Sequence, residues 1–476
     1  MRVPPHRSPR ANLVSLLLAL IVLVSTGAAA IAGTATGTPG TERWVERYGG
    51  PGNRFDGARE VAVSPDGGTV FVTGDSNGPS SRSDFATLAY DAADGTTLWT
   101  KRYDGPAGTD DFASSLAVSP DGTTVFVAGE SNGATGGLDY AVLAHDATTG
   151  DRLWKRRYDG PGHSLEALTG LAVTPDGSAV LVTGRSIGAS SGSDVATLAF
   201  DAASGTRLWV ARYNRAGQSS DGGNAVTVTP DGSMALVAGF ITRSGSNSDY
   251  LTQAYDATTG ARVWTKKFGG PAGEDDVAGS ITVSPDGTRT FVTGNGTGAT
   301  NSTNYTTIAY DTATGDRQWT RRYDGPGHAT DFANAIAADP AGANVYVTGQ
   351  SDGDTTGADF ATVAYDAMTG ADGWTQRHGG PDDSFDGAVA IATSPDGVDV
   401  FVTGIVGSPS SLDDYSTLAY EAGTGSPLWD ETYNGPGNGP DRTFDLAVNP
   451  SGDAVFVTGF SRGELGFEYA TVSYAA

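Results

Sequence analysis

The residues best able to do chemistry in this chain are eight acids that recur at one spacing. Each stands nine positions before the proline of a repeated turn, which in its commonest form reads Ser-Pro-Asp-Gly. Carboxylates suit Ca²⁺, a cation that prefers oxygen ligands, and they could also line a pore or serve a hydrolase or lyase as acid and base. The eight acids, which we call the ring acids, are Asp56, Asp111, Glu166, Asp221, Asp276, Asp331, Asp386 and Asp441.

A structural role would explain the same acids. Each could accept hydrogen bonds from loop N–H groups of its own or the neighbouring repeat. Because one ion uses only a few of eight carboxylates, recurrence in every repeat favours this structural role. Ca²⁺ binding is most attractive where further acids reinforce the ring, at Asp110, Asp275, Asp382 and Asp383.

Other chemistries find little support in the residue types. The chain has no cysteine, which excludes disulfides, thiolate nucleophiles and cysteine-ligated zinc. Its glycine-rich segments do not lead into helices, so they are turns and not phosphate-binding loops. The formal net charge of −26 makes nucleic acids and anionic membrane surfaces unfavourable partners.

The elements that must position these acids form an internal repeat of 55 residues. All eight tryptophans of the chain follow that step, and so do the eight turn prolines. A fixed period of this size indicates an array of identical supersecondary units. The tryptophans are Trp44, Trp99, Trp154, Trp209, Trp264, Trp319, Trp374 and Trp429.

One repeat contains four short apolar, β-branched runs separated by turn residues. In the second repeat these are residues 112–119, 123–129, 139–146 and 151–158, which we expect to be four antiparallel strands. After its leader the chain begins with a lone fourth strand, and it ends on a third strand. We therefore predict an all-β, eight-bladed propeller of four-stranded antiparallel blades, closed where the N-terminal strand completes the C-terminal blade.

The first residues are typical of a targeting segment. Three arginines precede an apolar run from Leu13 to Val24, and small residues follow it. We expect a signal peptide over residues 1–32, cleaved after Ala30 or Ala32, with an uncleaved N-terminal anchor as the alternative. A short linker at 33–40 would then lead into a single propeller domain at 41–476.

The repeated segment "AYDAADGTTLW" at 89–99 resembles the tryptophan-docking motif of quinoprotein-like, pyrroloquinoline-quinone-type eight-bladed propellers. The segment "VFVTG" at 70–74 is similar to YVTN-type propeller repeats. The resemblance implies that each tryptophan docks between blades against the glycine turn of an adjoining motif, with Trp99 and Gly95 in those roles. It also implies a quinone and Ca²⁺ over the central axis in the enzymes of the family.

Near-identical blades favour binding over catalysis, because a quinone dehydrogenase needs different residues on different blades. We expect a secreted, monomeric, non-enzymatic scaffold that binds a protein or glycan through its loop-rich face. A quinone- or calcium-dependent dehydrogenase and a calcium-dependent adhesin are the alternatives. The sequence establishes no cofactor: Ca²⁺ suits the ring acids, and pyrroloquinoline quinone is disfavoured.

Overall fold

The computed structural model describes residues 37–476 apart from positions 53, 80–81, 135, 216–218, 244–246, 272, 299–301, 355–356, 382–384, 409–411 and 465. The expected signal peptide at 1–32 lies outside the described residues, and so does the first half of the linker, 33–36. In the part of the chain that is described, no helix has the length and apolarity needed to span a bilayer.

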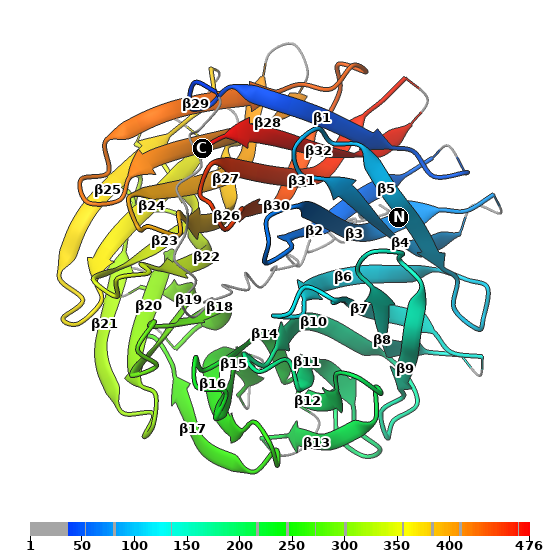
Figure 1. Cartoon of the computed structure of the whole chain (residues 1–476). Coiled ribbons are helices and arrows are strands. Elements are labelled where there is room, and N and C mark those ends of the chain that lie inside the picture. The colour runs from blue at the N-terminus through cyan, green and yellow to red at the C-terminus, as the bar shows by residue number, and fades with distance from the viewer. Residues whose placement is uncertain are drawn as a thin grey trace, which may run out of the picture.

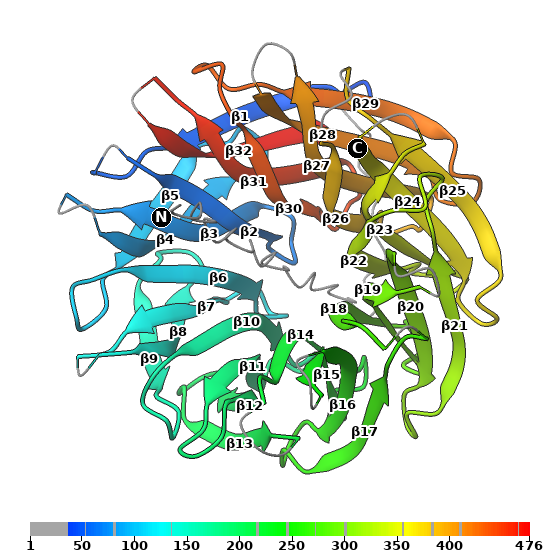
Figure 2. The same ribbon diagram turned by 180° about the vertical axis from the view of Figure 1, so that it is seen from behind.

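The described chain forms a ring of eight four-stranded antiparallel sheets around a central axis, which confirms the predicted propeller (Figure 1). We number the blades in chain order: blade 1 is β2–β5, blade 7 is β26–β29, and blade 8 combines β30–β32 with β1. The view from behind shows the same radial arrangement, with the first strand of each blade nearest the axis (Figure 2).

The strands occupy four positions from the axis outward. The innermost are β2 (Asp56–Val63), β6 (Asp111–Val118), β10 (Glu166–Val173), β14 (Gly222–Val228), β18 (Val277–Val283), β22 (Asp331–Ala338), β26 (Gly387–Thr393) and β30 (Arg442–Val448). The second are β3 (Thr69–Asn77), β7 (Thr124–Asn132), β11 (Ala179–Ile187), β15 (Met234–Thr242), β19 (Arg289–Thr297), β23 (Asn344–Asp352), β27 (Asp399–Ser408) and β31 (Ala454–Arg462).

The third strands are β4 (Ser83–Asp91), β8 (Leu138–Asp146), β12 (Ser193–Asp201), β16 (Ser248–Asp256), β20 (Thr303–Asp311), β24 (Ala358–Asp366), β28 (Leu412–Glu421) and β32 (Phe467–Ala475). The outermost are β5 (Thr97–Tyr103), β9 (Arg152–Tyr158), β13 (Arg207–Tyr213), β17 (Arg262–Phe268), β21 (Arg317–Tyr323), β25 (Asp372–His378), β29 (Pro427–Tyr433) and β1 (Glu42–Tyr48).

The N-terminal strand closes the ring as the sequence predicted. β1 pairs antiparallel with β32, with Val45 opposite Val472 and Tyr48 opposite Tyr469. Just before it, the N–H of Gly40 donates to the carbonyl of Ala475 at 2.8 Å. The first and last described segments therefore share one blade.

The hydrophobic core lies between blades and not at the axis. The buried apolar side chains of the described residues fall into clusters that each draw on two neighbouring blades. Phe71 and Trp99 of blade 1, for example, share a cluster with Leu116 and Val127 of blade 2. Each interface thus depends on the apolar, β-branched pattern from which the strands were predicted.

The tryptophans dock across these interfaces, as the family resemblance implied. The Trp99 Nε1–H donates to the carbonyl of Ala147 in the next blade at 2.9 Å, and its ring lies against Gly150. Gly95 receives Trp44 of the preceding blade. Gly95 has φ +78°, and an added Cβ would lie 2.8 Å from the Trp44 ring, so only glycine fits there.

The two faces of the ring differ in their connections. One face carries the segments that enter the inner strands and those that join second to third strands, and we call it the loop face. The opposite turn face carries the Ser-Pro-Asp-Gly turns, such as 64–68, and the turns before the outer strands, such as 92–96. The ring acids stand at the loop-face end of the inner strands.

Candidate functional site

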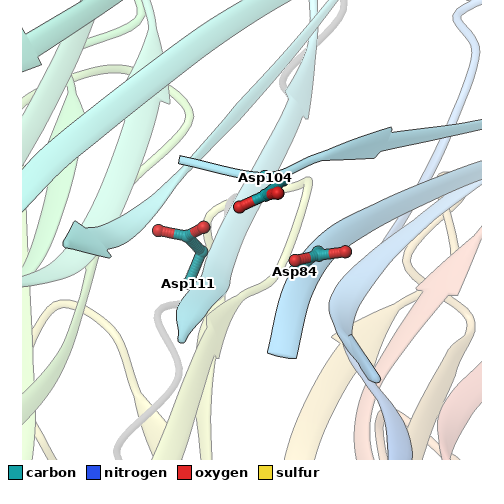
Figure 3. A group of neighbouring side chains, drawn as sticks. All are labelled: Asp84, Asp104 and Asp111. Carbon is teal, nitrogen blue, oxygen red and sulfur yellow. The ribbon is translucent and has the colours of Figure 1, made fainter. Parts of the chain in front are cut away.

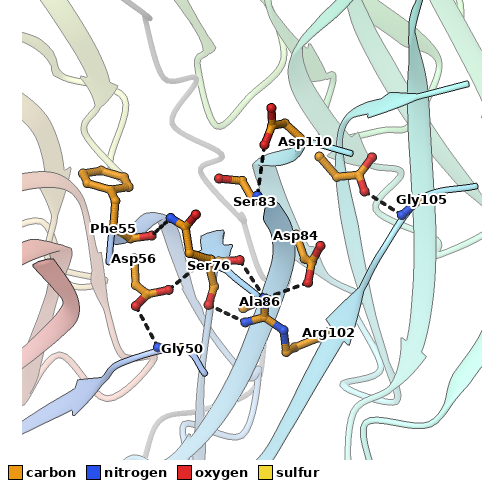
Figure 4. Close-up of polar contacts among 12 residues, drawn as sticks. Gly50, Phe55, Asp56, Ser76, Ser83, Asp84, Ala86, Arg102, Gly105 and Asp110 are labelled. Carbon is orange, nitrogen blue, oxygen red and sulfur yellow. Dashed lines mark hydrogen bonds and ion pairs between the residues drawn. The ribbon is translucent and has the colours of Figure 1, made fainter. Parts of the chain in front are cut away.

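The ring acids are buried at the start of the inner strands, where each fastens a loop of its own blade. Asp56 Oδ2 accepts from the Gly50 N–H at 2.7 Å, and its Oδ1 accepts from the Asn77 N–H at 2.8 Å (Figure 4). The same pair of donors, six residues before and twenty-one after the acid, binds Asp111, Asp221, Asp276, Asp386 and Asp441.

The two remaining ring acids keep part of this pattern. Asp331 accepts from the Gly325 N–H at 2.9 Å, and Glu166 accepts from the Ser186 hydroxyl at 3.3 Å. Burial raises the pKa of Glu166 and Asp331, and the hydrogen bonds to their carboxylates act in the opposite direction. These contacts meet the requirements of the structural role, and cation binding by the ring stays a prediction.

The acids that were expected to reinforce the ring lie between blades. Asp110 Oδ1 accepts from the Ser83 N–H at 3.1 Å, and its Oδ2 lies 3.6 Å from Arg82. Asp275 Oδ1 accepts from the Ser248 N–H of the preceding blade at 2.7 Å. Asp382 and Asp383 lie outside the described residues. Asp110 and Asp275 thus tie a loop to the third strand of the previous blade.

Among the described residues, two groups of three carboxylates could hold a metal ion, and neither was predicted as a group. One joins Asp84, Asp104 and Asp111, with one oxygen of each within 4.8 Å of the others (Figure 3). Its equivalent one blade further on is Asp139, Asp159 and Glu166. The sequence does carry a signal for these groups. It is an acid in the third strand, a second acid twenty residues later, and then a ring acid.

Arginines of the outer strands neutralise part of these groups. Arg102 Nη2 donates to Asp84 Oδ2 at 2.7 Å (Figure 4). Its Nη1 donates to the Tyr48 hydroxyl of the neighbouring blade at 3.1 Å. Arg157, Arg212 and Arg377 repeat this arrangement with Asp139, Asp194 and Asp359. Each arginine joins two blades near the loop face, which reduces the negative charge available to a cation.

The repeat is broken by an aromatic group where blades 8 and 1 meet. Phe55, Phe444, Phe460 and Phe467 form a half-buried aromatic group there, with ring centroids 5.2–5.8 Å apart in the contacting pairs. The Arg59 guanidinium lies 4.7 Å from the Phe444 ring centroid, and that of Arg462 lies 5.1 Å from Phe467. We call these six residues the junction cluster.

Four blades away, the corresponding positions are mostly polar. They hold Asp275, Gly279, Asn224, Phe240, Thr242 and Asn247. In that blade Asn224 Nδ2 donates to the Ala278 carbonyl of the next blade at 2.8 Å, so this residue fastens blades to one another. The junction cluster was not singled out from the sequence, because its members come from four segments that only ring closure brings together.

Buried charges also concentrate at this junction. Arg59 Nη2 donates to Asp75 Oδ2 at 2.9 Å inside blade 1. Burial raises the pKa of Glu130 in blade 2 to about 7, and Asp75 raises it as well while Arg185 lowers it. Glu60 and Asp445 are each only 5 % exposed. Blades 8, 1 and 2 therefore hold ionisable side chains where the other blades have mostly small or neutral ones.

A cavity of about 430 Å³ occupies the turn-face half of the axial channel. Inner strands from blades on opposite sides of the ring line it, with valine, alanine and leucine predominating. Turn prolines stand at its outer end, and Pro340, Pro395 and Pro450 are exposed, so the cavity opens on the turn face. Glu60 and Asp445 are the acidic side chains of its lining.

This cavity does not fit pyrroloquinoline quinone. The quinone carries three carboxylates, so a site for it needs cationic partners. No lysine or arginine belongs to the cavity lining that the described residues form, and its two carboxyl groups would repel an anionic ligand. The donor set thus opposes the cofactor of the family's dehydrogenases.

The sequence matches the family model described as outer membrane protein assembly factor BamB over residues 27–280 and 192–362. The chain belongs to this family. Its repeat and its blade architecture therefore agree with the quinoprotein-like resemblance that the tryptophan motif carried. No curated protein matches the sequence.

Solved structures show the same fold at low identity. Sqt1 of Chaetomium thermophilum, bound to the N-terminus of ribosomal protein L10, is 13% identical with a TM-score of 0.59, covering 88% of this chain and 97% of that one. The Dos1 propeller is 13% identical, with a TM-score of 0.59 and coverage of 92% and 95%. Quinohemoprotein alcohol dehydrogenase of Comamonas testosteroni is 13% identical, with a TM-score of 0.55 and coverage of 91% and 76%.

Proposed function

We propose that this protein is a secreted, non-enzymatic scaffold that binds a protein partner through its loop face, with the junction cluster as the principal contact. The observation that carries the proposal is that cluster: four half-buried phenylalanines and two arginines that together break the repeat where blades 8 and 1 meet. Aromatic residues and arginine are enriched where protein interfaces gain most of their binding energy.

Two further observations support a binding role. Most ring acids already accept two backbone N–H groups, so they are poorly placed to exchange protons with a substrate. The structurally similar Sqt1 propeller was solved with a bound segment of ribosomal protein L10, so this fold can serve as a binding platform. A rigid ring with divergent residues on one face is the usual arrangement of a binding surface.

Site-specific photo-crosslinking tests the contact. A photoreactive phenylalanine analogue placed at position 460 or 467 should capture a protein partner from the protein's native medium. The same analogue at position 240 is the matched control, because Phe240 has the register of Phe460 but lies four blades away. Equal capture from positions 240 and 460 would contradict the proposed contact.

The dehydrogenase alternative has its own assay. Purified protein is mixed with pyrroloquinoline quinone and Ca²⁺, and dye reduction is followed with alcohols and sugars as substrates. We expect no turnover, because the channel lining lacks cationic groups for the quinone. Turnover above a heat-denatured control would overturn the non-enzymatic part of the proposal.

A further inference from the structure

Two carboxylic acids occupy one register position on adjacent inner strands. Glu60 of β2 and Asp445 of β30 both follow the bulged residue of their strand. The other six blades place small residues at this position: Ser115, Gly170, Ala225, Ser280, Ala335 and Ala390. The pair is therefore a local departure from the repeat and not a property of the blade.

Each acid has a backbone donor but no counter-charge. Glu60 Oε2 accepts from the Leu116 N–H at 2.8 Å, and Asp445 Oδ2 accepts from the Val61 N–H at 3.0 Å. Within the described chain neither acid belongs to an ion pair, since Arg59, next to Glu60 in sequence, binds Asp75. Glu60 Oε1 has no hydrogen bond to any described residue.

The pKa values of both acids reflect the lack of a positively charged partner among the described residues. Burial, together with the charge of Asp445, raises the pKa of Glu60, and burial raises the pKa of Asp445 to about 7. Among the described residues, Asp445 is the charged group that acts on Glu60, and no positively charged one acts on either acid. Burying carboxylates without a positive partner is unfavourable, so the pair would be stabilised by a cation that arrives from outside.

The route for such a cation is the axial cavity, because both acids belong to its lining. Beyond them the wall is apolar, including Val63, Leu116 and Val448, out to the exposed prolines of the turn face. A volume of about 430 Å³ lies within the range of small-ligand pockets. A ligand entering from the turn face would pass along an aliphatic wall before meeting the two carboxyl groups.

We propose that the turn-face half of the axial channel binds a primary ammonium ion with an aliphatic body, its charged end held by Glu60 and Asp445. An ammonium group offers three donors and one positive charge, which suit two neighbouring carboxyl groups that lack a positive partner. The aliphatic body would bury apolar area against the valine, alanine and leucine wall. This site lies on the face opposite the proposed protein contact and does not depend on it.

A bare metal ion fits the same cavity poorly. Ca²⁺ takes six to eight oxygen ligands, and Mg²⁺ keeps several waters around it. Besides the two acids, Thr393 is the residue of the described lining with a side-chain oxygen. An apolar wall therefore favours an organic cation over an inorganic one.

Isothermal titration calorimetry on the mature protein tests the proposal with hexylammonium as the probe and 1-hexanol as its neutral counterpart. We expect saturable binding of hexylammonium near pH 8 and at least tenfold weaker binding of 1-hexanol. Asp445→Asn and Glu60→Gln should each weaken hexylammonium at least tenfold. Glu431→Gln, an exposed acid on β29, removes the same charge and should leave the affinity unchanged.

A second variant separates loss of the site from loss of folding. Ala392→Leu adds bulk to the channel wall and keeps both acids, so hexylammonium binding should fall while the melting temperature stays close to wild type. Equal affinity for hexylammonium and 1-hexanol would overturn the proposal. A hexylammonium affinity that is unchanged in Asp445→Asn would also overturn it. The same holds for saturable Ca²⁺ binding that depends on Glu60 and Asp445 while hexylammonium does not bind.

Discussion

The two sides of the ring are built on one repeat but use it differently. Around blades 4 and 5, the bulge and the position after it hold Asn224, Ala225 and Ser280, which pack closely or fasten one blade to the next. Where blades 8 and 1 meet, the same positions hold Phe444, Asp445 and Glu60. Because both sides keep the same backbone register, the repeat supplies stability and leaves side chains free to diverge.

The largest expected effect concerns the docking tryptophans. Trp209→Ala should cost about 3–5 kcal/mol, because the indole is buried between blades and its Nε1–H donates to Ala257 at 2.9 Å. Trp429→Ala in blade 7 should cost less, because Trp429 is only partly buried and the described residues supply no acceptor for its N–H. Thermal unfolding of both variants measures the difference, and equal losses would contradict it.

The buried acids should make the junction side sensitive to pH. The raised pKa of Asp445 means that the folded protein holds a proton that the unfolded chain has already lost, so stability falls as pH rises from about 4 to about 7. Asp445→Asn removes this loss. At about pH 8 it should raise the free energy of unfolding by on the order of 2–4 kcal/mol, and at about pH 4 by little.

The opposite side provides the reverse experiment. Ser280→Asp installs a carboxyl group at the same register in blade 5, where no acid is present. Its melting temperature should fall below wild type increasingly between about pH 4 and pH 7. A pH-independent change in either variant, measured by thermal unfolding across that range, would show that burial does not control these carboxyl groups.

The ring acids should not distinguish the two sides. Asp441 and Asp221 each accept two backbone N–H groups, from residues six before and twenty-one after them. Replacing either by alanine leaves those donors without their acceptor, at a cost of about 1–3 kcal/mol. Chemical denaturation should give similar losses for both. A much larger loss of partner binding for Asp441→Ala would assign that acid a role beyond fastening its loop.

The smallest effect is expected at the outer rim. Lys101 Nζ lies 2.9 Å from Asp151 Oδ1, and Lys266 Nζ lies 3.3 Å from Asp316 Oδ1 three blades away. Both aspartates are largely exposed, so Lys101→Ala and Lys266→Ala should each cost no more than about 1 kcal/mol. A larger loss in thermal unfolding at physiological salt would mean that these pairs hold blades together.

The fold could be predicted in detail because it is repeated. The spacing of Trp44 to Trp429 and the alternation in segments such as 112–119 were sufficient to predict blade number, strand order and closure. The docking of tryptophans against glycine turns was implied by the family resemblance, with Trp99 and Gly95 in those roles, and the structure pairs Trp99 with Gly150 and Gly95 with Trp44. Because the pattern of each strand recurs in every repeat, one strand with an ambiguous sequence had little effect on the predicted fold.

The candidate sites were less accessible to sequence reasoning, for two physical reasons. The ring acids were found by spacing and were expected to accept loop N–H groups, but the donors themselves, Gly50 and Asn77 for Asp56, are known only from the structure. Glu60 and Asp445 lie 385 positions apart, and they become neighbours only because the last blade meets the first. A search for a fixed period finds residues that recur in every repeat. Glu60 and Asp445 stand at a position where the other six repeats have small residues, so such a search misses them.

Closure by β1 has a consequence for how the molecule is made. β1 precedes the other described strands and its partner β32 follows them, so β1 has no partner, and the outer edge of β32 is not covered, until the two ends of the described ring meet. Joining such distant ends costs little more entropy than a much shorter loop would. At high concentration, however, β1 of another molecule competes for that edge, so strand-exchanged oligomers are the expected misassembly during refolding.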